Sequence, residues 1–144
     1  MIKTTFKALA FAILAACLPL KAIAGTDAKH KLVIQVSTDD PRLQTIALNN
    51  AVALQKHYGL DEVEIEIVAF GLGLGLLTKK SGQADRVESL AMQEITFSAC
   101  GNTMKKVAKK TGKMPVLLEG VTEVTSGVVQ ILELQEQGYA YVRP

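Results

Sequence analysis

Cys100 is the residue of this chain best suited to chemistry, because it follows a predicted strand and directly precedes a predicted helix. Residues 95–99 (ITFSA) have the apolar and β-branched character of a short buried strand, and the helix is expected over residues 102–110. A helix N-terminus presents free N–H groups and a partial positive charge, which lower the pKa of a cysteine placed there. The resulting thiolate is a nucleophile and can carry sulfur as a persulfide.

The three residues after Cys100 could support such a reaction. Gly101 would leave room for a sulfur donor, and Asn102 and Thr103 could donate hydrogen bonds to a developing anion. The alternative is a structural cysteine, since free cysteines are among the most buried residues and often only fill space. The residues alone leave both interpretations open.

The N-terminal segment has the three regions of a secretory signal peptide over residues 1–24. A basic head (residues 1–7) precedes an apolar run (residues 8–20), and Ala22-Ile-Ala24 is a small-x-small cleavage site. The apolar run is too short to span a bilayer. We therefore expect a periplasmic or secreted protein, with residues 25–31 forming a flexible lead-in.

A second interpretation of the same segment is a lipoprotein signal. Leu14-Ala-Ala-Cys17 resembles a lipobox, in which Cys17 would become a lipidated N-terminus facing the periplasm. Both interpretations take the domain out of the cytoplasm. In the ordinary secreted form Cys100 is the only one of the two cysteines that stays, so no intramolecular disulfide can form.

Removal of the signal peptide also changes the charge. Residues 1–24 hold three of the 16 basic residues and none of the 14 acidic ones, so the formal net charge falls from +2 to −1. Global charge therefore gives no reason to expect binding to nucleic acid or to an anionic membrane. The two histidines, His30 and His57, have no nearby partners at metal-ligand spacing, so we predict no metal and no cofactor.

The rest of the chain predicts one α/β domain over residues 32–144. Strands and helices alternate without any hairpin signal, which favours a parallel sheet with helices on both faces. Predicted strands cover residues 32–36, 61–70, 95–99, 121–124 and 139–142; predicted helices cover 41–58, 85–94 and 102–110, with a last helix capped by Ser126 and closed by Gly138.

Periodicity also predicts which side chains are buried. On the helix over residues 41–58 the inward face is expected to hold Leu43, Ile46, Ala47, Ala51 and Leu54, and on the last helix Val128, Ile131, Leu132 and Gln135. Glutamates at 62, 64 and 66 alternate with Val63, Ile65 and Ile67, so we expect them to face solvent.

A glycine-rich segment, Gly71-Leu-Gly-Leu-Gly-Leu-Leu77, follows the second predicted strand. The backbone at Gly71 and Gly73 could form an anion-binding nest. The intervening leucines need burial, which favours a tight, buried connection over a phosphate site.

Several segments together resemble the DsrE/DsrF-like family, specifically its exported branch described as intracellular sulfur oxidation proteins. The matching segments are Leu32-Val-Ile-Gln-Val-Ser37 with Asp40-Pro41, Ala47-Leu-Asn-Asn-Ala51, Val63-Glu-Ile-Glu-Ile-Val-Ala69 with Gly71-x-Gly73, Phe97-x-Ala-Cys100-Gly-Asn-Thr103, Ser126-Gly-Val128 and Leu134-Gln-Glu-x-Gly-Tyr-Ala-Tyr141. The resemblance implies a three-layer α/β/α fold with a five-stranded, mostly parallel sheet. It also implies a homo-oligomer, a trimer or hexamer, and a persulfide-carrying role for Cys100.

Two functions are therefore expected from the sequence. The first is a periplasmic sulfur-handling protein, at most a sulfurtransferase-like carrier, in which Cys100 accepts sulfane sulfur and passes it to a thiol-bearing partner. The second is a non-enzymatic oligomeric module that binds a small anion or another small ligand near Gly71, Gly73 and Asn102, with Cys100 structural.

Overall fold

The computed structural model describes residues 30–144 of the chain. The predicted signal peptide, Cys17 and residues 25–29 of the predicted lead-in lie outside the described residues. Within residues 30–144 no helix is both long enough and apolar enough to cross a lipid bilayer.

Strands and helices alternate along the described chain, as the sequence predicts. The strands are β1 (His30–Val36), β2 (Val63–Ala69), β3 (Ile95–Cys100), β4 (Val121–Val124) and β5 (Ala140–Val142); the helices are α1 (Pro41–Tyr58), α2 (Ala84–Ala91), α3 (Gly101–Thr111) and α4 (Gly127–Glu136), with 3-10 segments η1 (Leu60–Glu62) and η2 (Gly71–Leu77).

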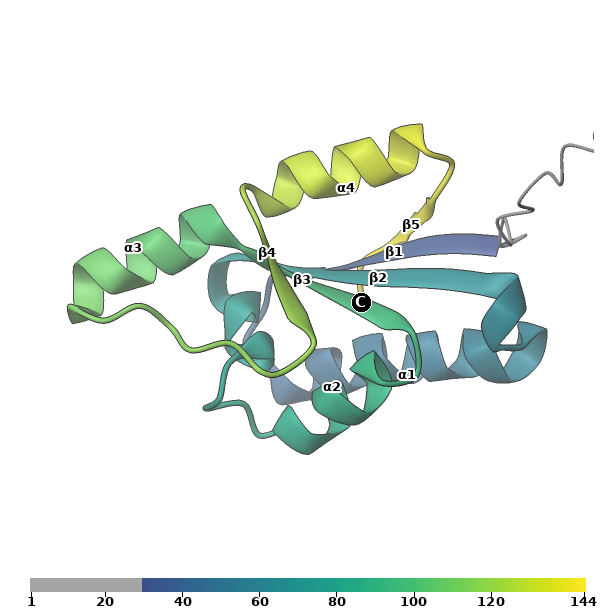
Figure 1. The fold of residues 1–144 in the computed structure, drawn as a ribbon, viewed down its shortest axis with the longest axis horizontal. Helices are drawn as coiled ribbons and strands as arrows, with labels where there is room; N and C mark the ends of the chain where they lie inside the picture. The colour runs from purple at the N-terminus through teal and green to yellow at the C-terminus, as the bar shows by residue number, and fades with distance from the viewer. Residues whose placement is uncertain (1–29) are drawn as a thin grey trace, which may run out of the picture.

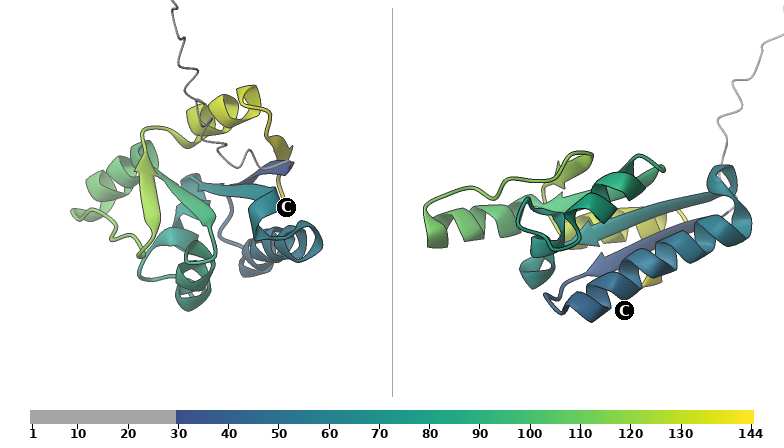
Figure 2. Two further views of the ribbon diagram at one scale, coloured as in Figure 1. Left: turned by 45° about the vertical axis from the view of Figure 1, so that its right-hand side comes forward. Right: turned by 90° about the horizontal axis from the view of Figure 1, so that it is seen from below.

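The five strands form one parallel sheet in the order β4-β3-β2-β1-β5, which confirms the predicted α/β fold class. The chain steps from β1 to β4 in one direction and then returns across the sheet to β5. Because such crossovers are right-handed, the return places its helix on the opposite face. Accordingly α1 and α2 cover one face, α4 covers the other, and α3 projects past the carboxyl ends of the strands (Figures 1 and 2).

The two faces of the sheet have cores of very different size. Alternate residues of β1, β2 and β3 pack with α1, α2, η2 and Met104 of α3 in the larger core. The core under α4 contains only five buried side chains, with Phe70 packed against them: Val33, Val68, Ile131, Leu134 and Tyr139. Apolar burial therefore holds α4 to the sheet less strongly than it holds α1.

The ends of the first helix follow from local chemistry. The Asp40 carboxylate accepts a hydrogen bond from the Arg42 N–H at 2.8 Å, Pro41 occupies the first turn, and Gly59 ends the helix with φ of 95°.

Strand β1 begins at His30, two residues earlier than predicted. His30 and Lys31 pair with β2 and so belong to the sheet rather than to the lead-in.

The buried face of α1 is rotated from the predicted one. Ile46 is 43% exposed, whereas Leu48 is fully buried and Gln44 and Gln55 are mostly buried. The two glutamine side chains donate to the carbonyl oxygens of Thr38 and Gln93, at 2.9 and 2.7 Å. Side-chain amides that have hydrogen-bond partners can be buried at little cost. The periodicity of the apolar residues alone therefore predicted the wrong inward face for α1.

The buried face of α4 also differs from the prediction. Ile131 and Leu134 face the sheet, while Val128 is 64% and Leu132 57% exposed. This helix is apolar on nearly all sides, so its sequence carries little information about which side turns inward.

Candidate functional site

Cys100 lies at the carboxyl edge of the sheet, where β3 ends and α3 begins. It is both the last residue of β3 and the N-cap of α3, with only 4% of its surface exposed, and its thiol is free. Side chains alternate along a strand, and Ala99 packs in the larger core. The thiol therefore faces the α4 side of the sheet.

The N-termini of two helices lie around this thiol and lower its pKa. Burial of the sulfur raises the pKa of Cys100, but the Thr103 hydroxyl and the N–H groups of Gly127, Thr103 and Asn102 favour the thiolate and bring the pKa below its usual value. Gly127 is the first residue of α4, whereas Asn102 and Thr103 belong to the first turn of α3. The positive ends of two helices thus converge on one sulfur atom.

The Thr103 hydroxyl is oriented toward the thiol by the glycine-rich segment. The Gly71 N–H donates to Thr103 Oγ1 at 3.1 Å, so the hydroxyl proton is free to be donated to Cys100. Gly71 has φ of 57°, a left-handed conformation that suits glycine. Gly71 therefore contributes to the site through Thr103, a connection the sequence did not indicate.

Gly127 is the site residue that the sequence analysis missed. A Cβ at this position would lie 2.8 Å from Cδ1 of Phe70, so only glycine lets α4 begin this close to the end of β2. Ser126-Gly127 does mark a helix start in the sequence. Which strand end that start would meet depends on the return crossover, which local patterns do not specify.

Two other predicted glycines make packing contacts. A Cβ on Gly101 would lie 2.5 Å from Glu123 Oε1, so the room predicted there for a sulfur donor is occupied by that carboxylate. Gly73 rests on the backbone of Val36, with a Cβ position only 2.1 Å from the Val36 carbonyl oxygen. Glycine at this position therefore allows η2 to pack against the end of β1.

Asn102 contributes through its backbone. Its N–H donates to the carbonyl oxygen of Thr125 at 3.2 Å and is also one of the groups that lower the pKa of the thiol, whereas the residue itself is exposed. The bond to Thr125 ties the start of α3 to the segment between β4 and α4.

Glu66 departs most from the predicted arrangement. We expected a solvated carboxylate, but Glu66 is only 7% exposed beneath α4. Its Oε1 atom accepts hydrogen bonds from Ser98 Oγ at 2.6 Å and from Gln130 Nε2 at 2.9 Å. The alternation of β2 is as predicted and Glu64 is exposed as expected, but the part of the same face at Glu66 is covered by a helix.

Comparison with solved structures places this architecture among known proteins. MTH1491 from Methanobacterium thermoautotrophicum, a protein of unknown function, is 33% identical, with a TM-score of 0.71 over 80% of this chain and 99% of that chain. This chain belongs to the same family as MTH1491, and its fold is DsrE-like. The ychN protein from E. coli is 16% identical, with a TM-score of 0.59 over 81% of this chain and 99% of that chain, and shares the fold. No protein-family description and no curated protein matches the sequence.

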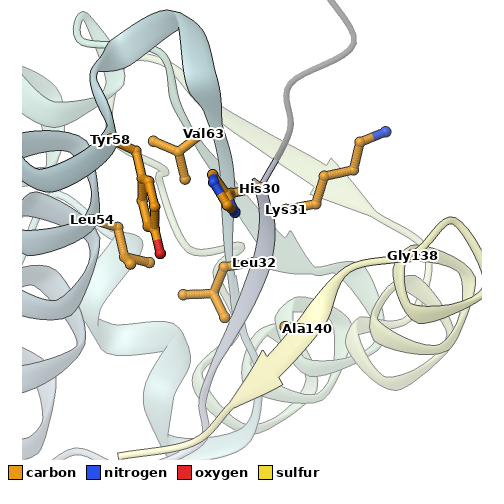
Figure 3. Close-up of a pocket in the computed structure, with 8 residues that line it drawn as sticks. All are labelled: His30, Lys31, Leu32, Leu54, Tyr58, Val63, Gly138 and Ala140. Carbon is orange, nitrogen blue, oxygen red and sulfur yellow. The ribbon is translucent and has the colours of Figure 1, made fainter.

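This DsrE-like domain has one cavity near the segment that links β4 to α4 and another near the start of β1. The first, of about 380 Å³, lies between β4 and α4 and is lined by Glu123, Val124, Thr125, Ser126, Val129, Gln130 and Glu133. The second, of about 270 Å³, lies at the start of β1, where the His30 ring stacks on Tyr58 at 3.8 Å (Figure 3). Only the first adjoins the residues that surround Cys100. Among residues 30–144, no group of three or more His, Cys, Asp or Glu side chains could hold a metal ion.

Proposed function

We propose that this protein is a periplasmic sulfur-handling protein in which Cys100 accepts sulfane sulfur and passes it to a partner thiol. The observation that supports the proposal is the convergence of two helix N-termini and the Thr103 hydroxyl on the Cys100 thiol. The same donors that stabilise a thiolate would stabilise the terminal anion of a persulfide.

The proposed chemistry has two balanced steps. The Cys100 thiolate attacks a sulfane sulfur of an inorganic polysulfide, forming a Cys100 persulfide anion and releasing a polysulfide one sulfur shorter. A partner thiolate then attacks the outer sulfur of the persulfide, which breaks the sulfur–sulfur bond and regenerates the Cys100 thiolate. No external oxidant or reductant is needed, because sulfane sulfur moves between thiolates.

Burial favours a second candidate, a non-enzymatic binding module in which Cys100 is structural. With 4% of its surface exposed, the thiol must become accessible before it can meet a donor. Iodoacetamide separates the two functions: a reactive thiol is alkylated at neutral pH in the folded protein, whereas a structural one is modified only on unfolding.

Sulfur loading tests the first proposal directly. We expect the protein, exposed to polysulfide and freed of excess reagent, to gain the mass of one or more sulfur atoms that dithiothreitol removes. The Cys100→Ser variant should gain none. Intact-mass spectrometry makes the measurement; an unchanged wild-type mass, or equal addition to the variant, would exclude the proposal.

Export remains the proposed route to the periplasm, on the pattern of residues 1–24. The intact mass of the protein from the membrane and periplasmic fractions reports its N-terminus. It thereby distinguishes cleavage after Ala24 from lipidation at Cys17.

We also propose that the protein is a homo-oligomer. Val128, Val129 and Leu132 form an exposed apolar surface on the outer side of α4, which a second copy of the chain would remove from water. We expect Leu132→Lys to lower the molar mass measured by light scattering, and Met92→Lys, at the exposed end of α2 on the opposite face of the sheet, to leave it unchanged. A monomeric wild type would contradict the proposal.

A further inference from the structure

The Glu66 carboxylate is a polar contact within an otherwise apolar helix–sheet interface. It lies beneath α4, where Gln130 donates to it, and the next inward residues of the helix, Ile131 and Leu134, supply apolar contacts. Ser98 Oγ donates to the same carboxylate oxygen. A buried charge needs such partners, and an apolar side chain would fill this place at lower cost. The carboxylate of Glu66 is therefore better explained by its effect on the placement of α4 than by a contribution to stability.

The spacing between the Glu66–Gln130 hydrogen bond and the thiol site is similar along α4 and along β3. Gln130 is three positions after Gly127, about one turn of α4, whereas Cys100 is two positions after Ser98 and shares one face of β3 with it. The first turn of α4 therefore places Gly127 over Cys100 and Gln130 over Ser98 and Glu66. Figure 1 shows α4 lying across this face of the sheet.

We propose that Glu66 and Gln130 are positioning residues for Cys100: their hydrogen bond fixes α4 at the distance and rotation that direct the Gly127 N–H at the sulfur. The inference rests on the proposed function only in taking the thiolate to be the reactive form. Without this hydrogen bond α4 would be held by its apolar contacts alone, and its first turn would be free to move from the sulfur.

Two glutamates and two lysines are the other charged groups considered around Cys100. Glu123 contacts Gly101 from β4, and Glu133 faces the same cavity from α4. Lys105 and Lys106 are exposed on α3. None of these changes in the variants below, so their effect on the thiol is constant.

The test is the pH dependence of Cys100 alkylation in Gln130→Ala. We expect the midpoint of the iodoacetamide profile to move to higher pH, and the rate at pH 7 to fall about threefold, as the loss of one hydrogen bond of about 0.7 kcal/mol implies. The matched control is Gln135→Ala, an exposed glutamine on the same helix, which should keep the wild-type profile. Equal midpoints in Gln130→Ala and Gln135→Ala would overturn the proposal.

A second pair of variants separates positioning from a general loss of stability. Glu66→Gln and Glu66→Leu both remove the carboxyl group, but only glutamine keeps an oxygen that accepts from Ser98 and Gln130, so the leucine variant should have the higher midpoint. This pair decides the question if Gln130→Ala fails to fold. Equal midpoints in the two Glu66 variants would overturn the proposal. Alkylation does not require sulfur transfer, so a failure of sulfur loading would leave this comparison intact.

Discussion

Gly73→Ala is expected to destabilise the protein by about 3 kcal/mol or more, because the added methyl group would overlap backbone atoms. Its Cβ would lie 2.1 Å from the Val36 carbonyl oxygen and 2.5 Å from the Val36 carbonyl carbon. A side chain could rotate away from such a contact, but the end of β1 cannot move without disturbing its pairing with β2. Urea denaturation measures the effect as a lower midpoint at an unchanged slope.

Gly75→Ala is the matched control for this prediction. Gly75 lies in the same 3-10 segment, and a Cβ there would meet no atom within 4 Å. Its backbone is not in the left-handed region, so alanine should be neutral or slightly stabilising through the unfolded chain. Equal stabilities of the two variants would show that the segment tolerates side chains at both positions and that η2 does not pack as described.

Thr103→Val is expected to lower the thiolate fraction of Cys100 at neutral pH by about tenfold, because it removes a hydrogen bond to a charged group. The substitution keeps the size and branching of the side chain but loses the hydroxyl that donates to the thiol. It also leaves the Gly71 N–H without its acceptor. That N–H lies in an exposed region where water can replace the threonine, so we expect a stability loss of only about 1 kcal/mol.

The alkylation rate as a function of pH measures this effect. The wild-type midpoint should lie below the ordinary thiol value, and that of Thr103→Val should lie above the wild-type midpoint. Thr103→Ser retains the hydroxyl and should stay close to the wild type. Coincident profiles for the valine and serine variants would show that the hydroxyl does not act on the thiol.

The lowered pKa of Cys100 also has a consequence for folding. A group whose pKa is lower in the folded state contributes stability that is fully present above its unfolded pKa. That contribution is lost as the pH falls through the folded pKa. The stability advantage of the wild type over Thr103→Val should therefore shrink across this window as the pH is lowered.

Much of the fold could be predicted because the sequence patterns that mark its strands and helices involve only neighbouring residues. The Asp40-Pro41 helix start, the alternation of β2 and the strand that ends at Cys100 each depend on a few neighbouring residues. Alternation of strands and helices without hairpin signals then favours a parallel sheet. A parallel sheet places the carboxyl end of β3, and Cys100 with it, at one edge next to a helix N-terminus.

The surroundings of the thiol could not be predicted in the same way, because they depend on contacts between distant segments. Gly71 and Thr103 are 32 residues apart, and Glu66 and Gln130 are 64 residues apart. No spacing in the sequence records that Gly101 would meet Glu123 or that Gly73 would rest on Val36.

The sequence by itself determined a parallel α/β domain with a cysteine between a strand end and a helix start, since propensity and periodicity act over short distances. Only the tertiary structure decided that the N-terminus of a second helix, α4, lies near the Cys100 thiol. The chain must cross from β4 at one edge of the sheet to β5 at the other, and the right-handed return carries α4 over the face that holds Glu66, Ser98 and Cys100. That crossover buries the Glu66 carboxylate, which was expected to face solvent, and places the Gly127 N–H near the Cys100 thiol.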